Sequence, residues 1–161
     1  MTKTIKINIA NRIKFYYDTR NHIWIYLRLP FFDSNGNEIQ FTDKDDNSKN
    51  FIFDTGAQNT IISNNRAKEC GYLNFPIVKQ VVAGGIGGGT VSCRKIKIPN
   101  ITISKKIVVS NPAILIPEDK NVNINILGQD LLKPFSYYFD AQQKFIYFDM
   151  NNLSLAQEDL E

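Results

Sequence analysis

This 161-residue sequence has few cysteines and histidines: it contains two cysteines and one histidine. Cys70 and Cys93 lie far apart, with no CxxC motif and no histidine near either. This spacing suggests neither a disulfide framework nor a metal site, so we expect two buried free thiols and no bound metal. The lone histidine, His22, has no serine or cysteine motif beside it, which favours a surface or structural role over a catalytic triad.

Long hydrophobic runs and long charged runs are absent as well. Residues 1–18 alternate polar and apolar side chains and never form the unbroken apolar segment of a signal peptide or membrane span. We therefore expect a cytoplasmic protein with no membrane partner. No run of five like charges occurs, and the net charge of +3 comes from scattered lysines and arginines. This mild basicity is the one feature that would favour a nucleic-acid-binding β domain, and it is too weak a signal. We therefore expect no nucleic-acid partner.

The overall amino-acid composition is typical of one globular domain. Hydrophobic residues make up 43% of the chain and charged residues 22%, with no biased segment, which disfavours disorder away from the ends. The length suffices for one core and is short for two. We expect residues 1–161 to form a single domain. Residues 1–20 and 150–161 are possible extensions that could add edge strands, cover an interface or pack loosely.

The hydrophobic pattern has a period of two along most of the chain, which predicts strands. The clearest such segments are residues 22–29, 93–103 and 144–148. Turn-forming residues separate them, at 33–37, 84–89 and 99–100. The sequence therefore predicts a mostly antiparallel, all-β fold. The polar segment 42–50 is interpreted as a solvated loop.

Two short helices are predicted. Ser63 can cap the start of the first, and Gly71 stands where that helix would end. The second begins near Gly128, and Pro134 limits its length.

The segment FIFDTGAQNT, residues 51–60, places a carboxylate directly after an apolar strand. Partial desolvation makes this position unfavourable for the Asp54 carboxylate, so its presence there indicates a functional role. Asp-Thr-Gly alone is a weak motif. Its context, however, is an apolar strand, then Asp54 to Ala57, a capped helix, a glycine-rich hairpin and the segment Asn125–Leu132. In that order and spacing, over roughly residues 22–149, the chain resembles the retropepsin-like aspartic proteases.

The resemblance implies a retropepsin-like acid-protease β-barrel with one short helix after the Asp-Thr-Gly loop and one in the C-terminal half, packed behind that loop. Asp54 would be the catalytic residue. In the active-site loop, Thr55 would hydrogen-bond across a subunit boundary, Gly56 would let the backbone approach the catalytic pair, and Ala57 would lie near the substrate. A glycine-rich flap hairpin would cover the cleft, with substrate-binding residues Gly84, Gly85, Ile86, Gly87 and Gly88.

Such an enzyme needs two carboxylates, one protonated and one charged, to activate a water against a peptide bond. The sequence has only one Asp-Thr-Gly, so this function requires a homodimer with Asp54 from each subunit, a peptide or protein substrate and no cofactor. The alternative is a catalytically inactive module of the same fold that binds peptides or dimerises.

The glycine-rich segment could also be a phosphate loop or a plain flexible turn. The GxGxxG pattern fails because Thr90 occupies the last glycine position, whereas a flexible turn stays possible.

The chain departs from the retroviral pattern at two positions, where Gln58 and Gln129 replace an acid and an arginine. We expect their side chains to form a neutral hydrogen-bonded pair between the loop and the second helix. Asp130, beside Gln129, is expected to cap or brace that helix. Residues 144–148 are the candidate edge strand at a dimer interface, because their open backbone groups would need a partner.

Overall fold

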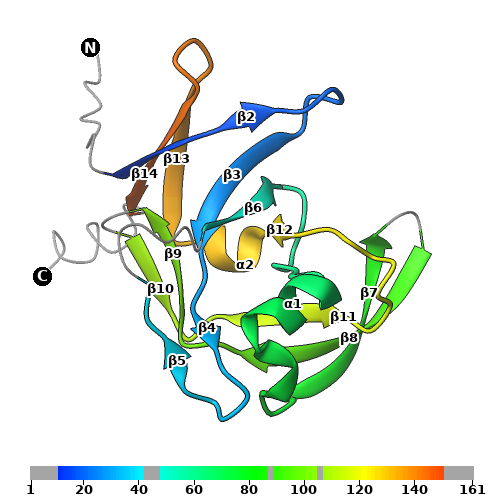
Figure 1. Ribbon diagram of the computed structural model, residues 1–161. Helices are drawn as coiled ribbons and strands as arrows, with labels where there is room; N and C mark the ends of the chain where they lie inside the picture. Colours follow the sequence, from blue (N-terminus) through cyan, green and yellow to red (C-terminus); the bar gives the residue numbers. More distant parts are fainter. Residues whose placement is uncertain (1–10, 42–47, 87–88, 105–106, 151–161) are drawn as a thin grey trace, which may run out of the picture.

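The computed structural model describes residues 11–41, 48–86, 89–104 and 107–150 (Figure 1). Strands dominate, and the helices include α1 (Asn64–Cys70), α2 (Gln129–Leu132) and a 3-10 turn at Tyr72–Asn74. The strands are β1 (Arg12–Lys14), β2 (Tyr16–Tyr17), β3 (Ile23–Arg28), β4 (Phe31–Phe32), β5 (Glu38–Ile39), β6 (Ser48–Phe53), β7 (Lys79–Ile86), β8 (Gly89–Lys97), β9 (Asn100–Ser104), β10 (Ile107–Ser110), β11 (Ala113–Pro117), β12 (Ile126–Leu127), β13 (Phe135–Asp140) and β14 (Phe145–Met150).

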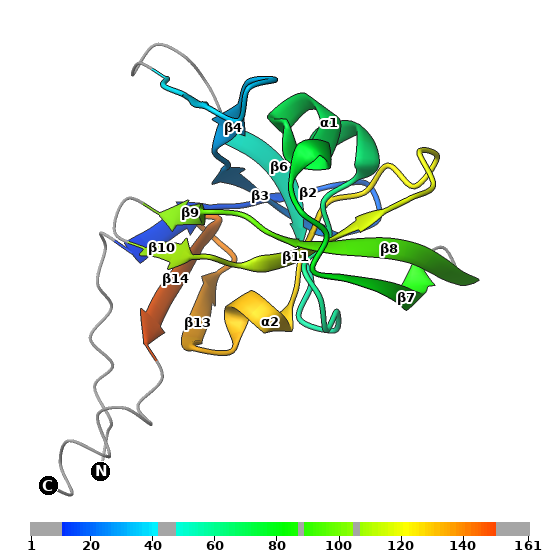
Figure 2. The same cartoon turned by 90° about the horizontal axis from the view of Figure 1, so that it is seen from below.

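The strands of the described residues form four sheets, and every strand pair but one is antiparallel. Strand orders are β1-β14-β13, β10-β9-β3-β6-β12 with β2 on β3, β11-β8-β7, and β4-β5. The exception is β12, which runs parallel to β6 and pairs Leu127 with Phe53. The prediction of a mostly antiparallel, all-β fold is therefore confirmed. Helices α1 and α2 lie on opposite sides of β8 in the view from below (Figure 2).

In the described part of the chain, the core consists of two hydrophobic clusters. The larger one surrounds the buried side chains of β3 and β6, including Ile25, Leu27 and Phe51. The smaller one contains Ile61, Cys93, Leu115 and Ile126 and lies between the β7–β8 hairpin and the segment after β6. Both cysteines are buried and unpaired, as expected from their spacing. Burial raises the pKa of the Cys70 thiol to about 12, so this thiol stays protonated at neutral pH.

Helix α1 has the caps that the sequence predicts. The Ser63 hydroxyl accepts a hydrogen bond from the backbone N–H of Arg66 at 3.2 Å. Gly71 ends the helix with φ +83°, in the left-handed region that favours glycine.

Two expectations about strand boundaries are wrong. Within the predicted loop 42–50, residues 42–47 lie outside the described residues, but residues 48–50 already belong to β6 and pair with β3. Residues 144–148 do not provide an open edge, because β14 lies between β1 and β13. The N-terminal segment supplies β1 and so covers the backbone groups that the sequence left without a partner.

Candidate active site

Asp54 is held at the end of a strand that is anchored on both sides. Strand β6 lies between β3 and β12, and the side chains of Phe51 and Phe53 are buried beneath it. The backbone N–H of Asp54 donates to the carbonyl of Leu127 at 3.1 Å, which extends the parallel pairing by one residue. The apolar strand therefore fixes the backbone, while the half-buried carboxylate points out of the core.

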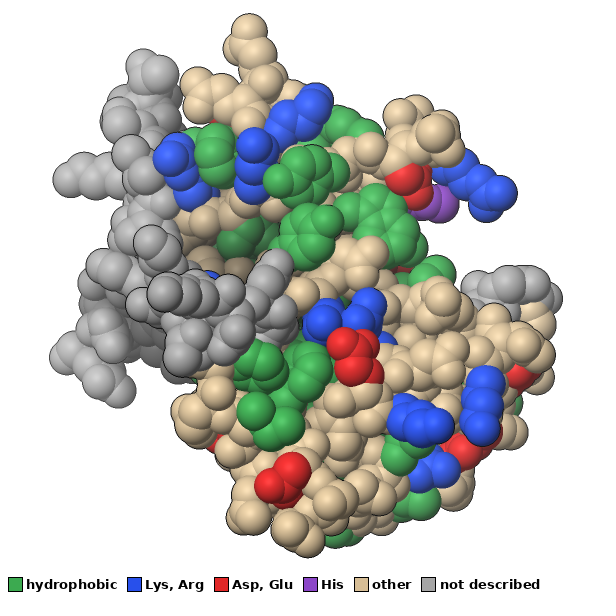
Figure 3. Space-filling view, in the orientation of Figure 1, with side chains coloured by type: hydrophobic (Ala, Val, Ile, Leu, Met, Phe, Trp, Pro, Cys, Tyr) green, Lys and Arg blue, Asp and Glu red, His purple; other side chains and the backbone are tan. Residues whose placement is uncertain are grey.

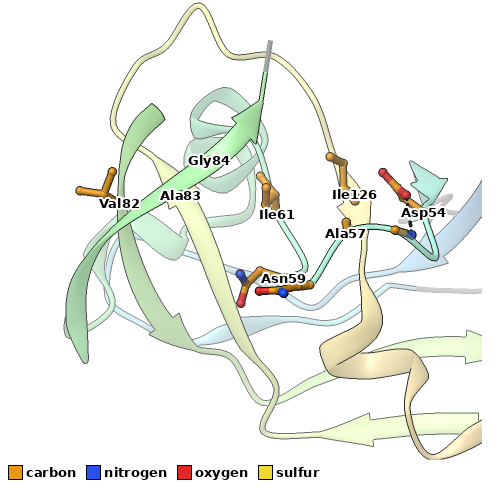
Figure 4. Close-up of a pocket in the computed structure, with 10 residues that line it drawn as sticks. Asp54, Ala57, Asn59, Ile61, Val82, Ala83, Gly84 and Ile126 are labelled. Carbon is orange, nitrogen blue, oxygen red and sulfur yellow. Dashed lines mark hydrogen bonds between the residues drawn. The ribbon is translucent and has the colours of Figure 1, made fainter. Parts of the chain in front are cut away.

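The Asp-Thr-Gly loop folds back on its own carboxylate. Oδ1 of Asp54 accepts a hydrogen bond from the backbone N–H of Gly56 at 2.9 Å (Figure 4). A Cβ at position 56 would lie 3.3 Å from that oxygen, tighter than an ordinary contact, so glycine gives this turn room. Thr55 and Gly56 are exposed in the single chain. The loop is therefore shaped by its own backbone and presents an open face.

Helix α2 packs directly behind this loop. The backbone N–H of Gln129 donates to the carbonyl of Ala57 at 2.7 Å, and that of Asp130 donates to the carbonyl of Gln58 at 3.1 Å. At position 128 a Cβ would come within 2.6 Å of the Asn59 backbone. Only glycine permits this close approach of helix and loop.

A side-chain bridge fixes the far end of the loop. Thr60 is fully buried, and its hydroxyl donates to Oδ1 of Asp130 at 2.7 Å while its backbone N–H donates to Oδ2 at 3.0 Å. The same hydroxyl accepts from the backbone N–H of Gly128 at 3.1 Å. Asp130 thus braces the helix against the loop. Sequence reasoning missed Thr60, whose only signal is a hydrogen-bonding side chain at the loop's end.

The predicted pair of Gln58 and Gln129 side chains does not form. The side-chain amide of Gln129 donates instead to the carbonyl of Thr55 at 2.8 Å and lies 3.4 Å from the hydroxyl of Tyr137. The physical reason is that Gln58 meets the helix through its backbone carbonyl, which leaves its side chain exposed in the cleft.

The glycine-rich segment forms a hairpin across from the loop. Strands β7 and β8 pair Gly84 with Thr90 and Ile86 with Gly89. Gly84 contributes to the cleft, and Gly85 and Ile86 continue β7 toward the tip. Gly87 and Gly88 lie outside the described residues.

The loop and the hairpin enclose a cleft of about 450 Å³. Figure 4 shows the Asp54 carboxylate on one wall and β7 on the other. The lining residues are Asp54, Gly56, Ala57, Gln58, Asn59, Ile61, Val82, Ala83, Gly84 and Ile126. Of the predicted active-site loop, Thr55 is not among them. Sequence analysis missed Ile61 and Ile126, which look like ordinary core residues, and Val82 and Ala83, whose only signal is their place just before Gly84.

Within the part of the chain that the structure describes, no three His, Cys, Asp or Glu side chains are grouped as metal ligands would be. Likewise, no described helix has the length and apolarity needed to cross a membrane.

The sequence of residues 43–134, more than half of the chain, matches the family of gag-polyprotein putative aspartyl proteases. The chain belongs to this family. Among solved structures, a retropepsin-like aspartic protease from Rickettsia conorii is similar, with 17% identity and a TM-score of 0.52 over 85% of this chain and 87% of that one. The EIAV protease complexed with the inhibitor HBY-793 matches with 19% identity and a TM-score of 0.44 over 59% and 92% of the two chains. No curated protein sequence matches.

Family and fold agree. The match over residues 43–134 includes the Asp-Thr-Gly loop and all of α2, and the similarity to the Rickettsia protease extends over most of the chain. The retropepsin-like aspartic protease family and its all-β fold, expected from the sequence motifs, are therefore confirmed.

Proposed function

We propose that the chain is an aspartic endopeptidase that acts as a two-fold homodimer, with Asp54 of each subunit forming the catalytic pair. One observation carries this proposal. Asp54 is the single charged side chain among the described residues that line the cleft, and it stands on a loop whose next two residues are exposed. A second carboxylate can reach Asp54 only from another molecule that covers this face.

The chemistry follows from placing two carboxylates in contact. Like charges at that distance do not both ionise easily, so the working pair shares one proton. The charged carboxylate takes a proton from a water that attacks the peptide carbonyl. The protonated carboxylate donates a hydrogen bond to the carbonyl oxygen, where negative charge develops. Within each subunit, the N–H of Gly56 holds the carboxylate in place for this step.

An extended peptide suits the cleft. Strand β7 is at the edge of its sheet, with β8 on one side and the cleft on the other, so its outer backbone groups can pair with an added strand. Ala57, Ile61 and Ile126 provide an apolar floor for side chains of the substrate. We therefore propose peptides or unfolded protein segments as substrates.

The test is cleavage of a peptide library by the wild type and by Asp54→Asn, at mildly acidic and neutral pH, with and without a pepstatin-type inhibitor. Asp54→Asn removes the ionisable pair and should abolish cleavage while the protein stays folded. Asp119→Asn is the matched control, because an asparagine oxygen can still accept the 2.8 Å hydrogen bond from Asn121 in this exposed turn.

Cleavage that survives Asp54→Asn would overturn the proposal. A folded wild-type dimer that binds peptides but cleaves none would instead support the inactive module. Sedimentation at the assay concentration tests the shared pair, because a strict monomer that cleaves peptides contradicts it.

A further inference from the structure

A row of side chains leads from the cleft across the β7–β8 hairpin. Ile61, which lines the cleft, forms a parallel bridge with Leu115 of β11. Leu115 is paired with Lys95 of β8, and Lys95 is paired with Lys79 of β7. Side chains of paired residues lie on the same face of a sheet, and neighbouring strands are about 4.8 Å apart. Both lysines therefore lie on the face that borders the cleft, with Lys95 two strands away from Ile61.

This face of the hairpin is apolar beside the cleft and basic at its outer end. In the row next to the two lysines, Val81 pairs with Cys93, and both pack with Ile61 in the smaller core cluster. Lys79 is exposed and Lys95 is half-buried. A lysine lays its aliphatic stem along apolar surface and keeps its ammonium group in water. The two positive charges therefore stand at the outer end of the apolar floor.

Strand β7 leads from the cleft to these lysines. Figure 4 shows Gly84, Ala83 and Val82 following one another away from Asp54. Lys79 is the first residue of the same strand, and its side chain lies on the same face as that of Ala83 because alternate residues share a face. An extended peptide rises about 3.3 Å per residue, as a strand does, so a peptide that follows β7 reaches Lys79 roughly four residues beyond Ala83.

The two lysines have no acidic partner in the protein itself. Among the described residues, neither Lys79 nor Lys95 forms an ion pair, and like charges directly opposite each other on two strands repel. Arg94, on the other face of β8, is by contrast paired with Glu118 at 2.9 Å. Over α1, Figure 3 likewise shows an acidic side chain lying against basic ones. A negatively charged group from a ligand would relieve the repulsion between the two lysines.

We propose that Lys79 and Lys95 form a subsite that selects an acidic side chain of the substrate, several residues away from the peptide bond that is cut. The inference rests on the proposed function, which places an extended peptide in the cleft beside Asp54. The apolar floor takes the residues nearer to the cut, and the two ammonium groups attract a carboxylate farther along β7. Such charge complementarity governs specificity more than overall affinity. The preferred substrate is therefore an apolar segment with Asp or Glu toward its outer end.

The test uses short apolar peptides in which one residue, glutamate or glutamine, is placed at each position in turn. At an outer position, kcat/KM of the wild type should be about threefold to tenfold higher for glutamate, as expected for ion pairs near a surface. Lys79→Gln combined with Lys95→Gln should remove this preference, and Lys79→Glu combined with Lys95→Glu should replace it with a preference for lysine. Lys120→Gln, in an exposed turn near α1, is the matched control and should keep the preference for glutamate. Circular dichroism checks that every variant folds.

Binding of the same peptides to Asp54→Asn, measured by fluorescence anisotropy, separates the subsite from the chemistry. If the wild type cleaves no peptide, but Asp54→Asn binds the glutamate peptides more tightly and loses this difference with the two glutamine substitutions, the subsite is supported and the proposed protease function fails. Cleavage without a preference for glutamate would leave the function standing and overturn the subsite. A preference that survives the two glutamine substitutions, that Lys120→Gln removes equally, or that is missing from both cleavage and binding would also overturn it.

Discussion

Thr60 and Asp130 lie 70 positions apart in the sequence and are joined by two hydrogen bonds, from the Thr60 hydroxyl at 2.7 Å and from its backbone N–H at 3.0 Å. They connect the end of the Asp-Thr-Gly loop to the start of α2. The loop that carries Asp54 is therefore held by a buried polar contact as well as by β6.

Thr60→Val should lower the free energy of unfolding by about 1–3 kcal/mol. The methyl group keeps the volume of the side chain but leaves the N–H of Gly128 and an oxygen of Asp130 without the Thr60 hydroxyl, and buried groups that lose a partner carry this penalty. Urea unfolding at equilibrium measures the change. Thr90→Val, at an exposed position of β8, is the matched control and should change the stability by less than about 0.5 kcal/mol. Equal effects of the two substitutions would contradict the role of the bridge.

Gly128→Ala should destabilise the fold by about 1–3 kcal/mol or more, because the added methyl group would lie 2.6 Å from the backbone of Asn59 and overpack the loop against α2. The backbone of Gly128 is extended, with φ −106°, so the effect comes from space and not from strain. Gly89→Ala meets nothing within 4 Å and serves as the control. Thermal unfolding of both variants provides the measurement, and an unchanged melting temperature in Gly128→Ala would show that the loop can move away.

Gln129→Met should lower kcat/KM of the proposed endopeptidase by roughly tenfold at most. The substitution keeps the length of the side chain and removes the amide that donates to the Thr55 carbonyl, and one hydrogen bond is worth about 1 kcal/mol. Because Gln129 acts through the loop, kcat should fall more than KM rises. Gln143→Met, in the exposed turn between β13 and β14, should leave both constants unchanged. An effect on KM alone would place Gln129 in substrate binding instead.

Asp18→Asn should destabilise the β2–β3 turn at neutral pH but much less in acid. The carboxylate accepts from the Trp24 indole, from the His22 ring and from two backbone N–H groups. The hydrogen bond from Trp24 is the main cause that holds the pKa of Asp18 well below its ordinary value. A lowered pKa in the folded state means that this stabilisation is present above the unfolded value of about 4 and is lost as the pH falls below it.

Melting temperatures of the wild type and Asp18→Asn should therefore differ at pH 7 and converge as the pH falls from about 4 toward 2. Asp33→Asn is the control, because the asparagine oxygen can keep both backbone hydrogen bonds that Oδ1 of Asp33 accepts. A difference for Asp18→Asn that stays constant down to low pH would show that the carboxylate charge does not contribute.

The sequence predicted those parts of the fold that are decided by a few neighbouring residues. Alternation placed β3 and β14, and Ser63 and Gly71 marked both ends of α1, because strand faces and helix caps are decided within a few residues. The Asp-Thr-Gly loop and the Gly128 helix were found through motifs, and the confirmed family explains why those motifs occur together.

The sequence did not predict which segments far apart in the chain would pair. The sequence could not show that β1 would cover β14, that Thr60 would meet Asp130, or that the amide of Gln129 would turn to Thr55 instead of Gln58. Ile61 and Ile126 look like ordinary core residues until the chain folds and sets them beside Asp54.

The sequence by itself determined that this chain has one Asp-Thr-Gly, an all-β pattern and two capped or glycine-led helices, since these follow from residue type and spacing. Only the tertiary structure decided which side of that loop is open and that the Gln129 amide connects the loop to Tyr137. The reason is that exposure and contact depend on how distant segments pack, and burial is a property of the whole fold rather than of any one segment.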